Sequence, residues 1–354
     1  MPNAKPQSRR ILLSEGSSLS ARQVITTLGL GGNHIEVCDP DPLCIGRFSR
    51  FVRRFHRCPG LAGDPAGYLA FLLNLLTRER FDVLLPIHEQ GYLLAKVAGR
   101  LAPLTAIALP AFENYAAVHD KAGFSRLLTE LRLPQPRTEI VTSAAELRRW
   151  PLFPSVIKTA VGTASRGIFF VHNTGDLERV AADLEEAGEF EGEIVIQVFA
   201  AGPLERAQAV FSHGSLIGAH QYRQVAEGPQ GGDRIKESVC RPNVRAHLAQ
   251  IGERLQWHGA LSVDYILKEP ETIPFYIDCN PRLVEPVNAL FSGVDLAGLL
   301  VAVSLGERPE EAPLSRAGVR TQMAIMGIIG CAIRDGSRPA LLSEALSLWR
   351  GSGA

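Results

Sequence analysis

The chain of 354 residues has 46% apolar residues, and its 37 basic side chains balance 37 acidic ones. This composition excludes a disordered or collagen-like chain, and the length predicts two or three domains of ordinary size. The zero net charge gives no general electrostatic reason to bind nucleic acid or an anionic membrane.

Six cysteines are scattered through the chain without a C-x-x-C pair. In a chain of this length, that pattern predicts reduced thiols and a cytoplasmic protein rather than a disulfide framework. Three apolar residues follow the basic start, and the apolar stretch 324–333 covers ten residues. A secretory signal needs about 7–15 apolar residues and a membrane helix about 20, so we expect neither.

Strands and helices alternate in the first hundred residues. The predicted elements are a strand at 10–13, a helix at 21–28, an apolar run at 35–37, helices near 46–56 and 65–80, and a strand at 81–86. Such alternation with short connections predicts a parallel α/β sheet. Ligands of these sheets bind at the loops after the carboxyl ends of strands, which makes 14–18 and 87–90 the candidate loops.

Arginine and phenylalanine are interleaved within residues 47–57 (R-F-S-R-F-V-R-R-F-H-R). Basic patches with aromatic residues between them occur in nucleic-acid-binding proteins. At helical spacing, however, the arginines share one face of the segment and the phenylalanines share another. We therefore predict an amphipathic helix that packs its aromatic face on the core and exposes its basic face.

From about residue 115 the pattern changes to many closely spaced strands. The predicted strands are 155–158, 168–172, 194–199, 208–211, 216–220, 261–267 and 274–279, with helices at 120–131, 175–187 and 243–257. Hairpin-like connections between the strands predict antiparallel sheets packed against helices, an α+β second half. Residues 308–317 have the composition of a linker, and 318–349 have a mostly helical pattern.

The stretch V-I-K-T-A-V-G-T-A-S-R-G at 156–167 places Lys158 at the end of a predicted strand and a loop of small residues after it. A loop of this kind can bring backbone N–H groups against phosphate oxygens, while a nearby ammonium group supplies a point charge. A hairpin with a solvated lysine has the same pattern. From these residues taken together, both interpretations stay open.

Two aspartates lie near the ends of neighbouring predicted strands. Asp264 precedes I-L-K-E-P-E-T-I-P-F-Y-I, and Asp278 and Asn280 follow it. Adjacent strands lie about 4.8 Å apart, so these carboxylates could share a small hard cation such as Mg²⁺, which takes oxygen ligands. The alternative is two edge-strand aspartates followed by an Asn-Pro turn.

Four segments occur in the order and spacing of a known family. They are H-D-K-A-G-F around Lys121, the G-T-A-S-R-G loop after Lys158, V-I-Q-V-F-A-A-G-P-L-E at 195–205, and D-Y-I with Y-I-D-C-N-P-R at 264–282. Together they resemble the ATP-grasp superfamily, and most closely its branch with carbamoyl-phosphate synthetase, biotin carboxylase and carboxylate–amine ligases. The resemblance covers roughly residues 115–305.

The resemblance implies an α/β N-terminal pre-ATP-grasp domain followed by an α+β two-lobed ATP-grasp domain. The implied boundaries are 1–115 for the first domain, 116–310 for the second (lobe A about 116–190, lobe B about 191–310), and 311–354 for a C-terminal helical extension. ATP and Mg²⁺ are the implied cofactors, with Mn²⁺ as an alternative to Mg²⁺.

Site roles also follow from the resemblance. The residues implied to bind ATP are Lys121, Lys158, Gly162, Thr163, Ala164, Ser165, Gly167, Gln197, Val198, Phe199 and Glu205. Asp264, Asp278 and Asn280 are the implied metal ligands, and Arg282 acts with Lys158 on the transferred phosphoryl group or the acyl phosphate. Glutamate is common in the family where this chain has Gln197 and Asp264, and neither change indicates loss of activity.

The implied activity is that of an ATP-grasp ligase that forms carbon–nitrogen bonds and releases ADP. It phosphorylates a small carboxylate or amino acid to an acyl phosphate and couples that to an amine, giving an amide or peptide bond. The rival enzyme is a bicarbonate-phosphorylating carboxylase or carbamoyl-phosphate-type enzyme. The rival without catalysis is an ATP-binding sensor or scaffold.

Substrate contacts are expected from three segments. A charged loop at 220–239, which could also be a solvated hairpin, supplies cations that can receive a carboxylate. The expected substrate residues are Arg223, Arg234 and Lys236 from this loop, Glu285 and Asn288 beyond the Asn-Pro-Arg turn, and Glu15 and Glu89 from the front domain. The expected partners are small-molecule carboxylate and amine substrates, without nucleic acid or membrane. A homodimer and the identity of both substrates stay open.

Overall fold

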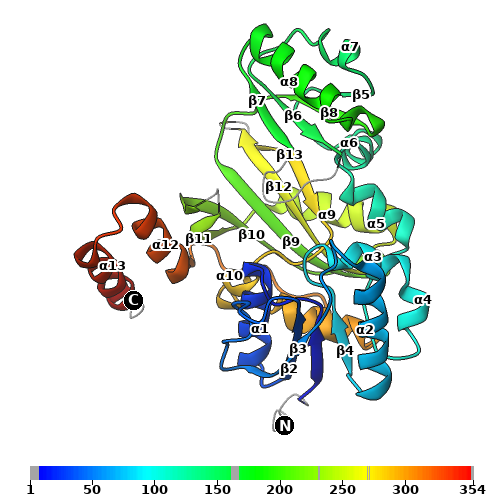
Figure 1. Cartoon of the computed structure of the whole chain (residues 1–354), viewed down its shortest axis with the longest axis vertical. Helices are drawn as coiled ribbons and strands as arrows, with labels where there is room; N and C mark the ends of the chain where they lie inside the picture. The colour runs from blue at the N-terminus through cyan, green and yellow to red at the C-terminus, as the bar shows by residue number, and fades with distance from the viewer. Residues whose placement is uncertain (1–7, 161–166, 230–231, 269, 271, 352–354) are drawn as a thin grey trace.

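The computed structural model describes residues 8–160, 167–229, 232–268, 270 and 272–351. Its three sheets and the helices around them form an α/β protein with both parallel and antiparallel strand pairing (Figure 1). Among the described residues, no helix combines the length and the apolar character that crossing a membrane requires.

The first sheet has four parallel strands in the order β3-β2-β1-β4. Its elements are β1 (Arg10–Leu13), α1 (Leu19–Leu30), β2 (His34–Asp39), β3 (Val52–Arg57), α2 (Pro65–Arg78) and β4 (Val83–Leu85). Ser18 and Asp64 begin α1 and α2 as N-caps, because their side chains accept backbone N–H donors. The predicted parallel sheet is confirmed, and the loops after β1 and β4 share one edge.

The predicted helix at 46–56 is wrong, because residues 52–57 form strand β3. This strand pairs in parallel with β2, and the buried His56 Nε2 lies 2.7 Å from Glu36 Oε2. The segment is too short for helical spacing to be separated from strand alternation, so the open edge of β2 decides its conformation.

Four helices connect the first sheet to the second half of the chain. They are α3 (Gln90–Lys96), α4 (Ala98–Leu101), α5 (Phe112–His119) and α6 (Lys121–Glu130). The Asp120 side chain caps α6 by accepting the Gly123 N–H, so Lys121 is the first helical residue. Both α5 and α6 pack against β13, which brings the start of α6 to the central sheet.

A second, smaller sheet is antiparallel and has the strand order β5-β8-β6-β7. Its elements are β5 (Thr138–Val141), α7 (Ala144–Leu147), β6 (Ser155–Thr159), β7 (Ile168–Val171), α8 (Thr174–Glu186), a 3₁₀ turn (Glu189–Glu191) and β8 (Ile194–Val198). The apolar stripe of α8, with Leu177, Val180 and Leu184, packs with Trp150 in a core of its own.

The central sheet has six antiparallel strands in the order β13-β12-β9-β10-β11-β14. Its elements are β9 (Leu204–Ser212), β10 (Ser215–Glu227), β11 (Asp233–Val239), α9 (Pro242–Leu255), β12 (Gly259–Lys268), β13 (Ile273–Asn280) and β14 (Arg320–Gln322). Helix α9 buries Val244, Leu248 and Ile251 against one face. The predicted antiparallel second half is confirmed.

The last part of the chain comprises α10 (Val287–Phe291), α11 (Leu296–Ser304), α12 (Ala324–Arg334) and α13 (Arg338–Gly351). The predicted helical tail is interrupted by β14, which pairs with β11 and lengthens the central sheet. Helices α12 and α13 pack on each other and lie to one side of the molecule (Figure 1).

The first sheet does not have a core of its own on the side of α1. Val24 and Ile25 of α1 belong to one continuous apolar cluster with Ala289 of α10 and Leu300 of α11. Helix α1 contacts both of those helices, and α11 also contacts β9, β10 and β12. The loops of the first sheet are thereby held against the ends of β12 and β13.

Candidate active site

Two lysines from different elements line one small cavity between the second and the central sheet. The Lys158 ammonium on β6 donates to the Ile277 carbonyl oxygen at 2.5 Å, and Lys121 Nζ lies 4.0 Å from Asp278 Oδ1. The Lys121 N–H also donates to Ala160 O at 3.1 Å, which ties the start of α6 to the end of β6. Burial lowers the pKa of Lys158 to about 8, although Asp278 raises it.

The two aspartates lie directly opposite each other on neighbouring strands. Asp264 of β12 pairs in register with Asp278 of β13, and Asn280 lies two residues further on β13. Burial raises the pKa of the Asp264 carboxyl, and the negative charge of Asp278 raises it further. We call Lys121, Lys158, Asp264 and Asp278 together the lysine–aspartate cleft.

The donor set of this cleft fits a divalent cation. Cross-strand neighbours have Cβ atoms about 4.5–5.5 Å apart, a separation at which two carboxylates can share one ion. A cation would also relieve the cost of burying Asp264 beside Asp278. The described residues contain no cluster of three or more His, Cys, Asp or Glu side chains suited to a metal, so any ion here would depend on the Asn280 amide and on substrate oxygens.

Arg206 is a central residue of the site that the sequence analysis missed. It is the register partner of Asp264 on one side and of Tyr222 on the other. Its guanidinium donates to Asp264 Oδ2 at 3.2 Å and to Asp233 Oδ1. These carboxylates raise the pKa of Arg206 despite its burial. The sequence signal was a basic residue within the strand-like segment 204–212 (L-E-R-A-Q-A-V-F-S), which is otherwise without a cation.

A second cavity lies at the edge of the first sheet. Glu89, His88 and His119 line it together with Lys121, Asp278, Asn280 and Arg282. His119 Nε2 lies 3.5 Å from Glu89 Oε2, and burial lowers the pKa of His119. The sequence analysis placed Glu89 here but missed both histidines. Their signal was their position: His88 lies in the loop after β4, and His119 directly precedes Asp120 and Lys121.

Arg282 joins three parts of the chain at this point. Its guanidinium donates to Asn280 Oδ1 at 3.3 Å and to Ser20 Oγ of α1 at 3.3 Å. Its positive charge lowers the pKa of His88 and of His119, in addition to burial. A cation that faces both the aspartate strand and α1 is suited to hold an anion between them.

The predicted adenine hinge lies on β8. Gln197 is buried, lines the same cavity as the two lysines, and donates through Nε2 to Thr138 Oγ1 at 2.8 Å. The N–H groups of Val198 and Phe199 donate to Arg137 O and Pro154 O, both at 2.9 Å. Any contact of these two residues with a base would therefore use their other atoms.

The predicted lid is described in part. Gly162, Thr163, Ala164 and Ser165 lie outside the described residues. Gly167 has a φ of +73°, and its carbonyl oxygen accepts the Thr159 N–H at 2.9 Å. A Cβ at this position would lie 2.1 Å from Thr159 Oγ1, so the loop requires glycine where it rejoins the sheet.

Three predicted site residues have partners within the protein and lie outside these cavities. Glu205 is buried and accepts from the Arg241 guanidinium and from the Tyr265 hydroxyl. Glu15 accepts the backbone N–H groups of Ser17 and Ser18, which shapes the loop before α1. Arg223 lies at the surface and pairs with Glu237.

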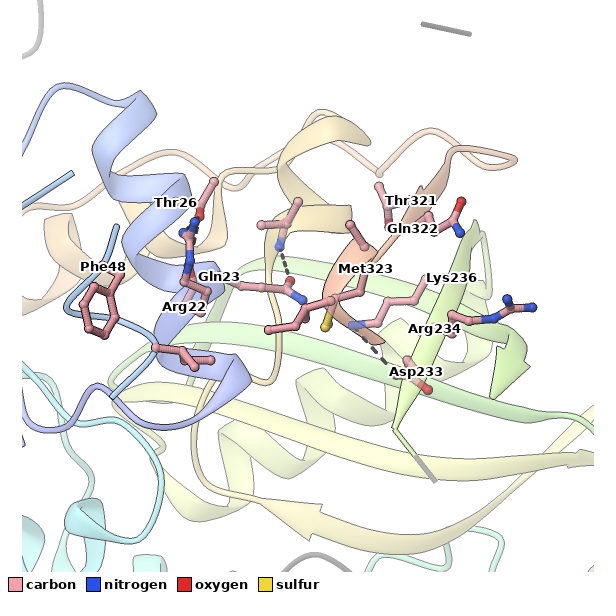
Figure 2. A pocket seen from close by; sticks show the side chains of 14 residues that line it. Arg22, Gln23, Thr26, Phe48, Asp233, Arg234, Lys236, Thr321, Gln322 and Met323 are labelled. Atoms are coloured by element: carbon pink, nitrogen blue, oxygen red, sulfur yellow. Dashed lines mark hydrogen bonds and ion pairs between the residues drawn. The ribbon is translucent and has the colours of Figure 1, made fainter. Parts of the chain in front are cut away.

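The remaining predicted substrate residues lie at or near a cavity of about 580 Å³ (Figure 2). Arg234 and Lys236 of β11 line it directly. Glu285 accepts from Lys236 and, at 3.0 Å, from Gln23 Nε2 of α1. Asn288 is buried and does not line the cavity; its Oδ1 accepts from His220 Nε2 at 2.8 Å, and its Nδ2 donates to Thr321 Oγ1 at 2.9 Å. We call this cavity the Arg22 pocket, after the α1 arginine that lines it.

No family model matches the chain. The large chain of carbamoyl phosphate synthase from Rubrobacter xylanophilus is 28% identical over 207 residues, which cover 53% of this chain and 19% of that protein. This chain therefore spans about a fifth of that relative's length.

Two solved structures share the fold. An L-amino acid ligase from Bacillus licheniformis has a TM-score of 0.64 at 15% identity, covering 86% of this chain and 76% of that one. The biotin carboxylase domain of 2-oxoglutarate carboxylase from Hydrogenobacter thermophilus has a TM-score of 0.68 at 16% identity. The match covers 89% of this chain and 74% of that one. The chain thus has the fold of the ATP-grasp superfamily, and about half of it is similar in sequence to a member of that superfamily.

Proposed function

We propose that the protein is an ATP- and Mg²⁺-dependent ligase that activates a small carboxylate as an acyl phosphate and joins it to an amine. The observation that carries this proposal is the lysine–aspartate cleft, in which Lys121, Lys158 and Asp278 line one cavity and Asp264 lies opposite Asp278 on the neighbouring strand. Paired lysines suit the phosphates of a nucleotide, and opposed carboxylates suit the cation that accompanies them.

The proposed roles follow from charge and position. Lys121 and Lys158 neutralise phosphate oxygens, Gln197 lies where the base would be held, and Arg282 faces the group that is transferred. Phosphoryl transfer depends mostly on positioning and on charge neutralisation, so no side-chain nucleophile is required. Bound at Asp264, Asp278 and Asn280, Mg²⁺ would supply further charge neutralisation at the phosphates.

The reaction balances in two steps. A substrate carboxylate oxygen attacks the γ-phosphorus of ATP, and the bond to the β–γ bridging oxygen breaks, which releases ADP with that electron pair. The amine nitrogen then attacks the acyl carbon, the carbon–oxygen bond to phosphate breaks, and the nitrogen loses a proton. The products are an amide, ADP and phosphate.

Three earlier assignments are not carried into this proposal. Glu205, Glu15 and Arg223 have their charges satisfied within the protein or lie at its surface. Glu89 stays a proposed substrate-facing residue, because it lines the cavity with Asp278 and Arg282.

We also propose the finer domain division. Residues 1–115 form a pre-ATP-grasp domain, 116–310 an ATP-grasp domain with lobes at about 116–190 and 191–310, and 311–354 an extension. The parallel first sheet and the separate apolar core of the small sheet support this division. Free thiols at all six cysteines support a cytoplasmic location. A homodimer stays a prediction.

The volume of the Arg22 pocket, about 580 Å³, is in the range of sites for organic ligands, which is about 300–1,000 Å³. This supports an organic molecule as one of the two substrates.

The test is to incubate the protein with Mg·ATP, hydroxylamine and single carboxylic or amino acids, and to measure phosphate and hydroxamate together. Hydroxamate that depends on particular acids is the expected result, and Lys158→Ala should abolish it. Phosphate release that depends on bicarbonate would support the carboxylase. If the protein binds nucleotide but releases neither phosphate nor hydroxamate with any acid, the result would support the ATP-binding sensor or scaffold.

A further inference from the structure

The Arg22 pocket has two chemically different sides (Figure 2). One side is formed by α1, with Arg22, Gln23 and Thr26, and by the neighbouring Phe48. The other is formed by β11, with Asp233 and Lys236, and by the segment that leads into α12. Its walls thus come from three parts of the chain that are far apart in sequence.

The β11 side connects directly to the lysine–aspartate cleft. Asp233 accepts from Arg206, which also donates to Asp264. Lys236 Nζ lies 3.8 Å from Asp233 Oδ2 and donates to Glu285. A ligand group at this end of the pocket would therefore lie on the side that Arg206 connects to Asp264, and Asp233 is the lining carboxylate that could accept from an amino group.

The α1 side offers a cation that the described protein groups do not neutralise. In the described part of the chain, the Arg22 guanidinium donates to two hydroxyl groups, Thr26 Oγ1 at 2.7 Å and Ser49 Oγ at 3.4 Å, and forms no salt bridge. A guanidinium with neutral partners suits a carboxylate, which it can bind through two parallel hydrogen bonds.

Apolar side chains line the space between these charged groups and open solvent. They are Ile45, Phe48, Val287, Met323, Ala324 and Ile325. Phe48 is 68% exposed and Ile325 41% exposed, although both are large apolar residues that face a cavity. Covering a phenylalanine or isoleucine side chain contributes about 1.5–3 kcal/mol, so an apolar ligand group is favoured here.

We propose that the Arg22 pocket binds the amine substrate, and that this substrate is an amino acid with a bulky apolar side chain. Its amino group lies at the Asp233 end, its carboxylate pairs with Arg22, and its side chain packs against Phe48 and Ile325. A carboxylate held by Arg22 is kept from phosphorylation, so this substrate supplies the nitrogen and not the acyl group. The inference rests on the proposed ligase function and names the substrate class.

Equilibrium dialysis with radiolabelled leucine, phenylalanine and glycine, in the presence of Mg·ADP, tests the proposal without requiring turnover. We expect leucine and phenylalanine to bind, and glycine to bind about tenfold more weakly or worse. Arg22→Met and Phe48→Ala should each weaken leucine binding by about tenfold or more. The proposal would be overturned if neither leucine nor phenylalanine bound, or if both variants bound leucine as tightly as the wild type.

Matched control variants separate the pocket from general effects. Arg53→Met removes an exposed arginine of β3, and Leu43→Ala removes a side chain that is 72% exposed in the same loop region as Phe48. Neither lines the pocket. Both should bind leucine as the wild type does, and a loss of binding equal to that of Arg22→Met and Phe48→Ala would contradict the assignment.

A parallel titration with a fluorescent ATP analogue distinguishes the two proposals. If leucine binds and nucleotide does not, the ligase function fails while the pocket assignment stands. If nucleotide binds and hydroxamate forms with some acid, but leucine and phenylalanine do not bind, the pocket assignment fails while the ligase function stands.

Discussion

The lysine–aspartate cleft and the Arg22 pocket are joined by one chain of charged groups, but they are built in different ways. In the cleft, Lys158 and Asp264 are held by strands, and each has oppositely charged groups around it. In the pocket, Arg22 comes from a helix and has hydroxyl partners, and much of the wall is apolar. The cleft is thus suited to chemistry that requires fixed charges, whereas the pocket is suited to selecting a substrate.

Removing a charge from the cleft should have the largest effect. Lys158→Ala and Asp278→Ala should each lower ATP turnover by about 100-fold or more, because in the proposed function each group neutralises or positions the transferred phosphoryl group. Circular dichroism should show an intact fold. Lys96→Ala, at a lysine that lies over the Phe112 ring, is the control. Wild-type turnover in both cleft variants would refute the site.

Arg206 tests the connection between the two regions. Arg206→Met leaves Asp264 and Asp233 without their shared guanidinium, which should lower the free energy of unfolding by about 3 kcal/mol. Urea denaturation measures this loss, and Arg206→Lys, which keeps a positive charge, should lose less. If Arg206→Met were as stable as the wild type, the ion pairs of Arg206 with Asp264 and Asp233 would not contribute to the stability of the fold.

The pH dependence of nucleotide binding tests the cleft by itself. Burial lowers the pKa of Lys158 from 10.5 to about 8, so the free protein loses this cation as the pH rises through about 8. Nucleotide affinity should therefore fall about tenfold between pH 7 and pH 9. Lys158→Arg, which stays charged, should remove this fall. An equal fall in that variant would assign the titration to another group.

Arg223 should give the smallest effect, because it lies on the surface and not in the pocket. Arg223→Met removes an exposed pair with Glu237, which should change the free energy of unfolding by less than about 1 kcal/mol. The apparent KM for the amine substrate should stay within about twofold of the wild type. A tenfold rise in KM for this substrate would move the substrate site toward the exposed hairpin.

Part of the fold and of the site follows from short-range patterns in the sequence. The alternation of strand and helix predicts the parallel first sheet, and the hairpin spacing predicts the antiparallel second half. Asp264 and Asp278 are predicted as neighbours because they lie near the ends of consecutive strands, and the register places them opposite each other. These features depend on residues close in sequence, where side-chain period and turn length are sufficient.

Other features depend on contacts that no local pattern contains. Residues 52–57 form a strand because β2 has an open edge, and residues 320–322 form one because β11 does. Arg206 joins the site through the register of β9 with its neighbours, and Arg22 through the packing of α1 on α10 and α11. The sequence by itself determined the parallel and antiparallel character of the two halves and the positions of the lysines and aspartates along the chain. The tertiary structure decided which charges meet and which stay unpaired, because strand edges and pocket walls are shared between distant segments.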